Sequence, residues 1–408
     1  MKISIMPAAR ISLFRSLPFR VLVAVFGVHI TGAAAPAAQP ALPAFDLAAH
    51  EAPRVTRLVG TALKKKPRTI TSVVNPRSAG GVHDFSSEGD YWWPDPANPD
   101  GPYIQRDGLS NPDNFVAHRR LLIAFSRDVA ALAAAYKLTR DERYAAAAAR
   151  HLRAWFVGPS TRMNPSLLYS QAIKGRATGR SIGLIDTLHL CEVALAAETL
   201  RGAQSYSKND DTAVTGWFRD YLHWMRTHAY GIEESEAKNN HGTCWTLQAA
   251  CFATLTGDAG TLALCRRRLK EIHLPDQMAA DGSFPLELRR TKPYGYSIFN
   301  LDVMTALGQI LGAPGENLIT WELPDGRSLA RGIAWLAPCL ADKSKWPLKP
   351  DVMYWDDWPV RQPALLFGAL AAGRADWLEI WKKLDPDPEV EEVQRNFPIR
   401  QPVLWVRQ

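Results

Sequence analysis

The chain has 408 residues, of which 47% are hydrophobic and 22% are charged, and it contains 14 tryptophans. This composition excludes an intrinsically disordered protein and predicts a globular protein with a large core. The formal net charge of +7 does not by itself indicate a nucleic-acid partner, because much of it lies at the N-terminus.

Residues 1–35 have the pattern of a secretory signal peptide. Four basic side chains precede the apolar stretch VLVAVFGVHITGAAAPA, which ends in small residues suited to cleavage near Ala35 or Ala37. The stretch is shorter than the ~20 residues that a spanning helix needs, which disfavours a membrane anchor. We expect an exported protein, periplasmic or secreted. Without residues 1–35 the chain has 44 basic and 41 acidic side chains, a formal charge of +3.

Residues 83–108, HDFSSEGDYWWPDPANPDGPYIQRDG, contain four prolines and cannot form a long helix. Trp92 and Trp93 offer flat apolar faces that can stack on sugar rings, while His83 and Arg106 can bind hydroxyl groups or a carboxylate. We therefore predict an arm that covers a bound ligand. The alternative is that its aromatic rings only pin a stiff loop to the rest of the fold.

From about residue 115, apolar residues recur with helical spacing, and breakers such as TGD and APGEN separate the segments every 20 to 40 residues. Few segments alternate with a period of two, so a sheet-based fold is excluded. We predict an all-α fold, an α/α toroid of antiparallel helical hairpins over residues 76–385. An N-terminal segment (36–75) precedes it and a C-terminal tail (386–408) follows it.

The apolar stripes that predict the helices share the 3.6-residue period. Four begin at Leu122, Leu184, Trp217 and Cys244, and five more lie in RDERYAAAAARHLRAWF, GTLALCRRRLKEIH, IFNLDVMTALGQILG, SLARGIAWLAPCL and QPALLFGALAAGRADWLEIWKKL.

Three long segments are predicted to be non-helical: residues 76–112, 157–181 and 274–296. Loops of this length on a compact scaffold usually carry function, and these contain aromatic and arginine residues. We expect them to form the walls of a cleft or tunnel.

The segment EESEAKNNHGTCW, residues 233–245, contains a candidate anion site. Asn240 and His241 lie at the start of a predicted helix, where free N–H groups and the helix dipole favour a carboxylate. Glu234 precedes His241 by seven residues and would share its face if the chain between them were helical. The alternative is that Asn239 or Asn240 only caps the helix and that Glu234 belongs to a solvated acidic run.

The segment DGSFPLELRRTKPYGYS, residues 281–297, places Arg289 and Arg290 beside Tyr294 and Tyr296. A phenol, with its usual pKa of about 10, becomes a usable base only if cations stabilise the phenolate. The alternative is a surface patch of arginines beside packed rings.

Motifs for other chemistries are missing. The sequence has no HExxH, no GxSxG, no phosphate-binding GxxxxGK[ST] and no GxGxxG after a strand. Its five cysteines are an odd number without CxxC spacing, so we predict small core residues rather than disulfides or a zinc site. We expect no metal and no cofactor.

Five motifs, in chain order over about residues 75–385, resemble the alginate lyase superfamily. They are GGVHDFSSEGDYWWPDPANPDGPY, MNPSLLYSQAIKGRATGRSIGLIDT, NNHGTCW, DGSFPLELRRTKPYGY and YWDDWPVRQPALLFGAL. The resemblance implies an α/α toroid that cleaves polyuronates. It also implies that Asn240 and His241 neutralise a substrate carboxylate, that Arg290, paired in the motif with Glu287, supports them, and that Tyr296 transfers the proton.

The gap from arginine to tyrosine is one residue shorter here than in the best-known branch of that family. Arg289 and Arg290 therefore remain alternatives, as do Tyr294 and Tyr296, and a neighbouring branch that acts on other β-linked uronans is possible. We expect the catalytic set Tyr296, His241, Asn240, Arg290 and Glu234. The expected substrate-binding residues are His83, Trp92, Trp93, Arg106, Gln171, Arg180, Arg289 and Tyr294.

The resulting hypothesis is an exported polysaccharide lyase that cuts a β-1,4-linked polyuronate by β-elimination, with mannuronate-rich alginate before glucuronan as its substrate. A glycoside hydrolase and a non-catalytic uronan-binding protein are the alternatives. Because an anionic polysaccharide would be repelled by six unpaired carboxylates, we expect the acids of residues 83–108 to pair with the arm's own turns and with Arg106.

Overall fold

The computed structural model describes residues 45–406, and the predicted signal peptide lies outside the described residues. Five helices follow one another side by side and form the inner layer. Helix α2 packs against α4, α4 against α7, α7 against α11, and α11 against α13. Their bounds are α2 Ala117–Thr139, α4 Leu190–Thr199, α7 Asn240–Thr256, α11 Pro293–Leu311 and α13 Pro363–Ala372.

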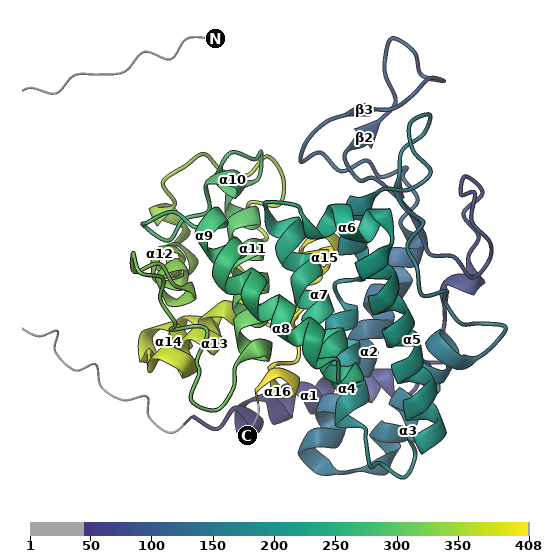
Figure 1. Cartoon of the computed structure of the whole chain (residues 1–408), viewed down its shortest axis with the longest axis horizontal. Helices are drawn as coiled ribbons and strands as arrows, with labels where there is room; N and C mark the ends of the chain where they lie inside the picture. The colour runs from purple at the N-terminus through teal and green to yellow at the C-terminus, as the bar shows by residue number, and fades with distance from the viewer. Residues whose placement is uncertain (1–44, 407–408) are drawn as a thin grey trace, which may run out of the picture. The chain divides into compact units, whose positions relative to one another are not determined.

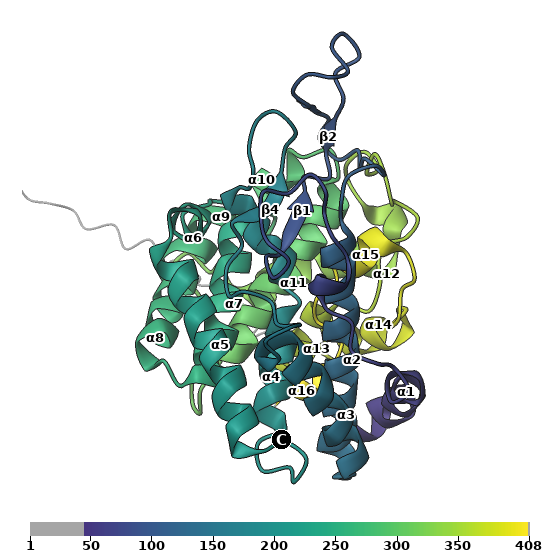
Figure 2. The same cartoon turned by 90° about the vertical axis from the view of Figure 1, so that its right-hand side faces the viewer.

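A second layer of helices packs outside the first, so that the predicted α/α toroid is confirmed (Figures 1 and 2). Helix α3 packs on α2, α5 and α8 on α7, and α12 and α14 on α13. The outer helices are α1 Leu47–Ala62, α3 Glu142–Leu152, α5 Lys208–Thr227, α8 Ala259–Arg268, α12 Leu329–Ala341 and α14 Ala375–Lys383.

The sequence of each helix explains its layer. Helices α7 and α13 are buried along almost their whole length because they are covered by neighbours on several faces, and neither contains Asp, Glu, Lys or Arg. Helices α3, α5 and α14 expose one polar face and bury the other. Phe125 of α2, stacked on Trp155 with ring centroids 4.4 Å apart, is one of many aromatic contacts in the core between the layers.

Caps and breakers set the helix ends. Asp141 and Ser207 accept hydrogen bonds from the first-turn N–H groups of α3 and α5, and Ser207 forms a capping box with Asp210. Gly373, with φ of 68°, ends α13 in the left-handed conformation. The segment 362–384, predicted as one helical element, is therefore the pair α13 and α14. The stripe that begins at Leu184 is also divided, into a 3₁₀ turn and α4.

Shorter elements complete the described chain. They are the 3₁₀ or π turns η1 Ile70–Ser72, η2 Arg153–Val157, η3 Ser181–Thr187, η4 Leu269–His273 and η5 Lys343–Lys345, the helices α6 Ala229–Ser235, α9 Leu274–Gln277, α10 Pro285–Leu288, α15 Glu391–Arg395 and α16 Pro402–Trp405, and the strands β1 Ser86–Glu88, β2 Trp92–Trp93, β3 Ile104–Gln105 and β4 Tyr169–Ala172.

The first two of the three predicted loops contain all four strands of residues 45–406. Strand β1 of the first loop pairs in parallel with β4 of the second, and β2 pairs with β3 in an antiparallel hairpin at the upper end of Figure 1. The third loop is shorter than predicted, because α9 and α10 lie within it and α11 already begins at Pro293. Tyr294 and Tyr296 therefore belong to the first turn of a helix.

The segments on either side of residues 76–385 pack against the helical layers. Helix α1 packs on α2, and α16 packs on α2 and α4 with Trp405 buried. The domain boundaries stay a prediction.

All five cysteines are free and buried, as predicted for core residues, and no helix among residues 45–406 is long and apolar enough to cross a membrane.

Candidate active site

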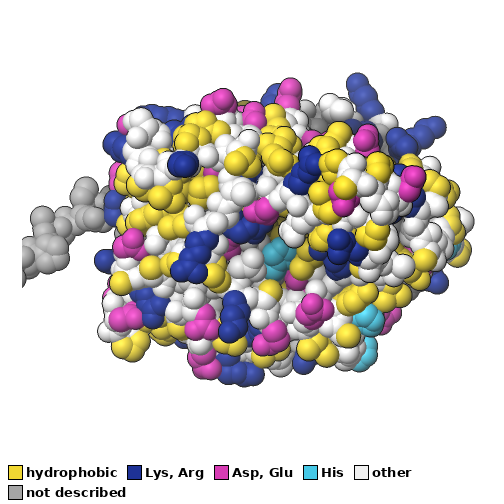
Figure 3. All heavy atoms as spheres, turned by 90° about the horizontal axis from the view of Figure 1, so that it is seen from above, with side chains coloured by type: hydrophobic (Ala, Val, Ile, Leu, Met, Phe, Trp, Pro, Cys, Tyr) yellow, Lys and Arg dark blue, Asp and Glu magenta, His cyan; other side chains and the backbone are white. Residues whose placement is uncertain are grey.

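A cavity of about 110 Å³ lies at the end of the fold that carries the three loops. Figure 3, which looks down on this end, shows a hollow with a histidine on its floor and Lys and Arg side chains around it. All three loops, the start of α7 and the end of α15 contribute to its lining. The lining residues are Asp90, Tyr91, Trp92, Gln105, Gln171, Arg180, Ile182, Ile185, Asn240, His241, Arg290, Tyr296, Phe299, Arg395 and Asn396.

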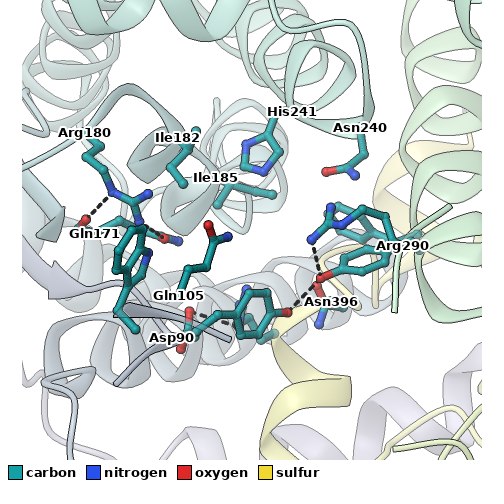
Figure 4. Close-up of a pocket in the computed structure, with 15 residues that line it drawn as sticks. Asp90, Gln105, Gln171, Arg180, Ile182, Ile185, Asn240, His241, Arg290 and Asn396 are labelled. Atoms are coloured by element: carbon teal, nitrogen blue, oxygen red, sulfur yellow. Dashed lines mark hydrogen bonds and ion pairs between the residues drawn. The ribbon is translucent and has the colours of Figure 1, made fainter. Parts of the chain in front are cut away.

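The first turn of α7 carries Asn240 and His241 into the cavity, as predicted (Figure 4). Asn239 caps the helix and accepts a hydrogen bond from the His241 backbone N–H. Glycine is required at position 242, because a Cβ there would collide with the carbonyl oxygen of Ala237. The tight entry into α7 therefore holds the two polar side chains at a helix N-terminus, where negative charge is favoured.

His241 is held by Glu234. The Nδ1 atom of His241 lies 2.6 Å from Glu234 Oε1, and the Glu234 side chain is almost completely buried. The chain between them is not one helix, because α6 ends at Ser235, so the predicted proximity is present but the predicted reason for it is wrong. Burial alone would lower the pKa of His241, but the Glu234 carboxylate outweighs burial and raises this pKa. Because Glu234 takes Nδ1, the other ring nitrogen remains for a ligand.

Asn240 is held by Glu287. The backbone N–H of Asn240 donates to Glu287 Oε1 and its side-chain Nδ2 donates to Oε2, both at 2.9 Å. An amide nitrogen has two N–H groups, and no described residue accepts a hydrogen bond from the second. Burial raises the pKa of Glu287 against the opposing effect of the Asn240 hydrogen bonds.

Arg290 and Tyr296 face this pair from the other wall. The Arg290 guanidinium donates from Nη2 to Tyr296 Oη at 3.0 Å and to Asp107 Oδ1 at 2.8 Å, and it lies 4.2 Å from the centroid of the Tyr296 ring. The hydroxyl groups of Tyr296 and Tyr91 share a hydrogen bond of 2.9 Å. Burial raises the pKa of Tyr296 well above its usual value, although Lys292 and Arg290 oppose this. Tyr296 is therefore a protonated phenol at neutral pH.

Arg180 and Gln171 lie on the side of the cavity away from Arg290 (Figure 4). Arg180 donates to the backbone oxygen of Gln171 at 2.8 Å and to its side-chain Oε1 at 3.2 Å. Its guanidinium lies 5.6 Å from the centroid of the Trp92 ring. The cavity thus has a fixed positive charge at each side and an apolar ring beside one of them.

Buried ion pairs lie beneath the cavity. Asp90 pairs with Arg119 at 2.5 Å and with Arg395 at 3.1 Å, and Glu392 pairs with Arg395 at 2.8 Å and with Lys292 at 2.9 Å. Burial would raise the pKa of Asp90, but the two arginines outweigh it and lower this pKa far below its usual value.

Three acids of the arm, Glu88, Asp90 and Asp107, pair with arginines in other segments and not with Arg106. Asp84 and Asp95 accept hydrogen bonds from backbone N–H groups of their own turns, as expected. Besides the pairs of Asp90 and Asp107, Glu88 pairs with Arg77. Arg106 instead lies over the ring of Trp93, 5.4 Å from its centroid. The expected pairing of these acids with Arg106 is wrong.

Five of the predicted substrate-binding residues do not line the cavity. The prediction that Tyr294 binds substrate is wrong, because Tyr294 is fully buried, packs on Trp346 and donates its hydroxyl to the Cys339 carbonyl oxygen. Arg289 is exposed while Arg290 lines the cavity, and of the two tyrosines only Tyr296 lines it, so the geometry favours Arg290 and Tyr296. The ring of His83 bonds to the carbonyl oxygen of Arg162. Trp93 and Arg106 lie on the β2–β3 hairpin, outside the lining.

The sequence reasoning missed several lining residues. Asp90, Tyr91 and Gln105 lie inside the quoted arm motif, so their position could have signalled them. Arg395 and Asn396 lie outside every motif and no local pattern marks them.

This arrangement can bind an anion and transfer a proton. Arg180, Arg290 and Arg395 supply positive charge, the raised pKa of His241 favours its charged form, and Asn240 supplies a neutral donor. Tyr296 can transfer a proton, and its hydroxyl is in direct contact with a fixed cation, Arg290. No cluster of His, Cys, Asp or Glu suited to hold a metal ion occurs within residues 45–406.

The chain is similar to known lyases. The family described as "Alginate lyase" matches residues 69–346. An alginate lyase from Bacteroides ovatus has a solved structure with 31% sequence identity and a TM-score of 0.76, covering 88% of this chain and 94% of that chain. No curated protein is significantly similar in sequence.

Two further solved structures are more distant. Alginate lyase A1-III from Sphingomonas species A1 is 15% identical with a TM-score of 0.54, again over 88% of this chain and 94% of that chain. A variant of alginate lyase A1-III complexed with a tetrasaccharide has the same identity, coverage and TM-score. At this identity the similarity shows the fold alone.

Replacing Glu234 by Gln tests the electrostatics of the histidine. Without the carboxylate, burial becomes the dominant effect, and the pKa of His241 should decrease to below its usual value of about 6.5. The measurement is an NMR titration of the histidine ring signals. Glu233→Gln, which removes an exposed neighbouring carboxylate, should leave this pKa unchanged. An unchanged His241 pKa in Glu234→Gln would contradict the assignment.

Proposed function

The chain belongs to the alginate lyase family and is a polysaccharide lyase, and we propose that it cleaves a β-1,4-linked polyuronate, mannuronate-rich alginate, by β-elimination. The observation that carries the proposal is the single cavity in which Asn240 and His241 face Arg290 and Tyr296. An anion-binding pair opposite a phenol beside a fixed cation matches what this elimination requires.

β-Elimination removes the proton at C5 of a uronate, next to the carboxylate, and then expels the oxygen at C4. An ionised carboxylate resists further negative charge, so the site must first reduce its charge. Asn240 can donate an N–H, and His241, kept protonated by Glu234, can donate from Nε2. Removing one such partner typically lowers the rate by ~10²- to 10³-fold.

Tyr296 is the proposed proton-transfer residue. In mannuronate, H5 and the leaving oxygen are syn, so one residue can take the proton and return it to the leaving group. The phenolate of Tyr296 would take H5, and the resulting phenol would protonate the C4 oxygen, which restores the phenolate. The phenol first loses its proton to water, and Arg290 and Lys292 favour the phenolate that results.

Polymer binding would use the other side of the cavity. Trp92 offers a ring face for a neighbouring sugar, and Arg180 supplies a positive charge for its carboxylate. Alginate lyase A1-III, with the same fold, has a variant that was complexed with a tetrasaccharide. This supports an oligosaccharide, not a single sugar, as the ligand.

A glycoside hydrolase is the disfavoured alternative. Hydrolysis requires two carboxyl groups placed on either side of the scissile bond. The candidate acids are already engaged: Glu234 with His241, Glu287 with Asn240, and Asp90 with Arg119 and Arg395. Glucuronan remains the second candidate substrate of a lyase, because glucuronate differs from mannuronate only at C2 and keeps H5 and the C4 oxygen syn.

We also propose export, because residues 1–35 have the signal-peptide pattern. When the full chain is expressed in a Gram-negative host, the protein should be found outside the cytoplasm with its N-terminus near residue 36 or 38. Fractionation and mass spectrometry of the intact protein measure both. An uncleaved chain in the cytoplasm would contradict the proposal.

The substrate is tested by a panel of three polymers. The purified protein should produce ultraviolet-absorbing unsaturated ends fastest from polymannuronate, more slowly from glucuronan and least from polyguluronate. Products without this absorbance but with new reducing ends would indicate hydrolysis. A faster reaction on glucuronan would make that polymer the substrate.

The two tyrosines of α11 form a matched pair of variants. Tyr296→Phe should lower kcat by about 10²-fold or more, because it removes the proton-transfer group. Tyr294→Phe should retain activity but lower the free energy of unfolding by about 1–2 kcal/mol, because its buried hydroxyl bonds to Cys339.

Initial rates of absorbance and thermal melts measure both effects. Near-normal product formation by Tyr296→Phe would rule out the tyrosine assignment, and a large loss of kcat in folded Tyr294→Phe would show that the pair does not separate catalysis from stability.

A further inference from the structure

A second cavity, of about 280 Å³, lies between α1, α2 and the C-terminal segment. No residue lines both this cavity and the catalytic one. Its lining is unusually basic and contains Arg54, Arg57, Lys65, Arg127 and Arg400, with Asp128 and Asp387 as the only acids among its lining residues.

Three of the five cations have a carboxylate partner. Arg54 and Arg57 both bind Asp387, at 2.7 and 2.5 Å, and Lys65 binds Asp128 at 2.7 Å. Both carboxylates of the lining therefore already form ion pairs, with Arg54, Arg57 and Lys65.

Arg127 and Arg400 have no carboxylate within ion-pair distance among the described residues. Arg127 donates to the side chain of Gln394 at 3.0 Å. Arg400, only 5% exposed, donates to the backbone oxygens of Phe397 and Gln394 at 2.9 and 2.5 Å. Burial and the nearby Arg127 lower the pKa of Arg400 to about 9. Two guanidinium groups thus line one cavity without a direct ion-pair partner, and only the more distant Glu192 and Asp387 offset the charge of Arg400.

A buried charge without a partner is costly, and a guanidinium offers its N–H donors as a planar fork that matches oxyanions. The volume exceeds the space that one water molecule needs several times over, so a small anion fits. We propose that this second cavity binds a small inorganic oxyanion of the phosphate and sulfate class, held by Arg127 and Arg400.

Binding there would act on the segment that reaches the catalytic cavity. Gln394 accepts hydrogen bonds from Arg127 and Arg400, and its neighbour Arg395 pairs with Asp90. An anion that holds the two arginines therefore also holds the end of α15 in place. This proposal is independent of the polysaccharide substrate.

Isothermal titration of the mature protein with sodium phosphate and sodium sulfate tests the proposal, against sodium chloride at equal ionic strength. One site per chain should be titrated by phosphate or sulfate. Arg127→Gln should weaken this binding by at least about tenfold, because it removes a charged hydrogen-bond donor. Arg219→Gln, which removes an exposed arginine elsewhere, should bind like the wild type.

Two further variants and one further ligand make the test decisive. If circular dichroism shows that Arg127→Gln does not fold, Arg57→Gln, whose side chain is 62% exposed, replaces it and should weaken binding several-fold. Arg180→Gln, in the catalytic cavity, should bind phosphate unchanged.

Four results would overturn the proposal: no binding beyond that of chloride, equal binding by wild type and the cavity variant, loss of binding in Arg180→Gln alone, or Arg127-dependent binding of sodium glucuronate without binding of phosphate or sulfate.

Discussion

The buried ion pairs around Asp90 hold the active site together. They join four segments that are far apart in sequence: the arm through Asp90, α2 through Arg119, the start of α11 through Lys292, and α15 through Glu392 and Arg395. Breaking one partner of a buried pair typically costs 3–5 kcal/mol, because an uncompensated charge remains. The positions of Tyr91, Trp92 and Tyr296 all depend on this junction.

The way acids are paired also determines whether the cavity attracts anions or cations. An enzyme that acts on a polyanion must keep its own carboxylates from repelling the substrate, yet acids are needed to orient the cations. Here each acid near the cavity is engaged: Glu234 holds His241, Glu287 holds Asn240, and Asp107 holds Arg290. The free donors that remain face inward and favour an anion.

Burial has a second consequence for the chemistry. Tyr296, proposed to take the proton from C5 and pass it to the C4 oxygen, is shielded from water, and that shielding raises its pKa. Arg290, in contact with both the ring and the hydroxyl, reduces the penalty without losing its own proton. In the proposed site, desolvation therefore raises the pKa of the Tyr296 phenol while the fixed cation Arg290 lowers it.

The sequence by itself determined the helical fold and the position of Asn240 and His241 at the start of a helix. It also indicated that the segment with the RR and YGY residues contributes to the cavity. Periodicity and capping are local properties, so they can be read from neighbouring residues. Tyr294 and Tyr296 are two residues apart on α11 and point about 200° apart around its axis. The local sequence pattern indicates that one of the two tyrosines faces the core, but it does not indicate which one.

Only the tertiary structure decided that choice, because it depends on where Trp346 and Cys339 pack. The same holds for Arg395 and Asn396, which reach the cavity from the far end of the chain through ion pairs with distant segments. Glu234 reaches His241 across a break between two helices and not along one. Contacts between remote segments depend on how the whole chain packs, and no short stretch of sequence contains that information.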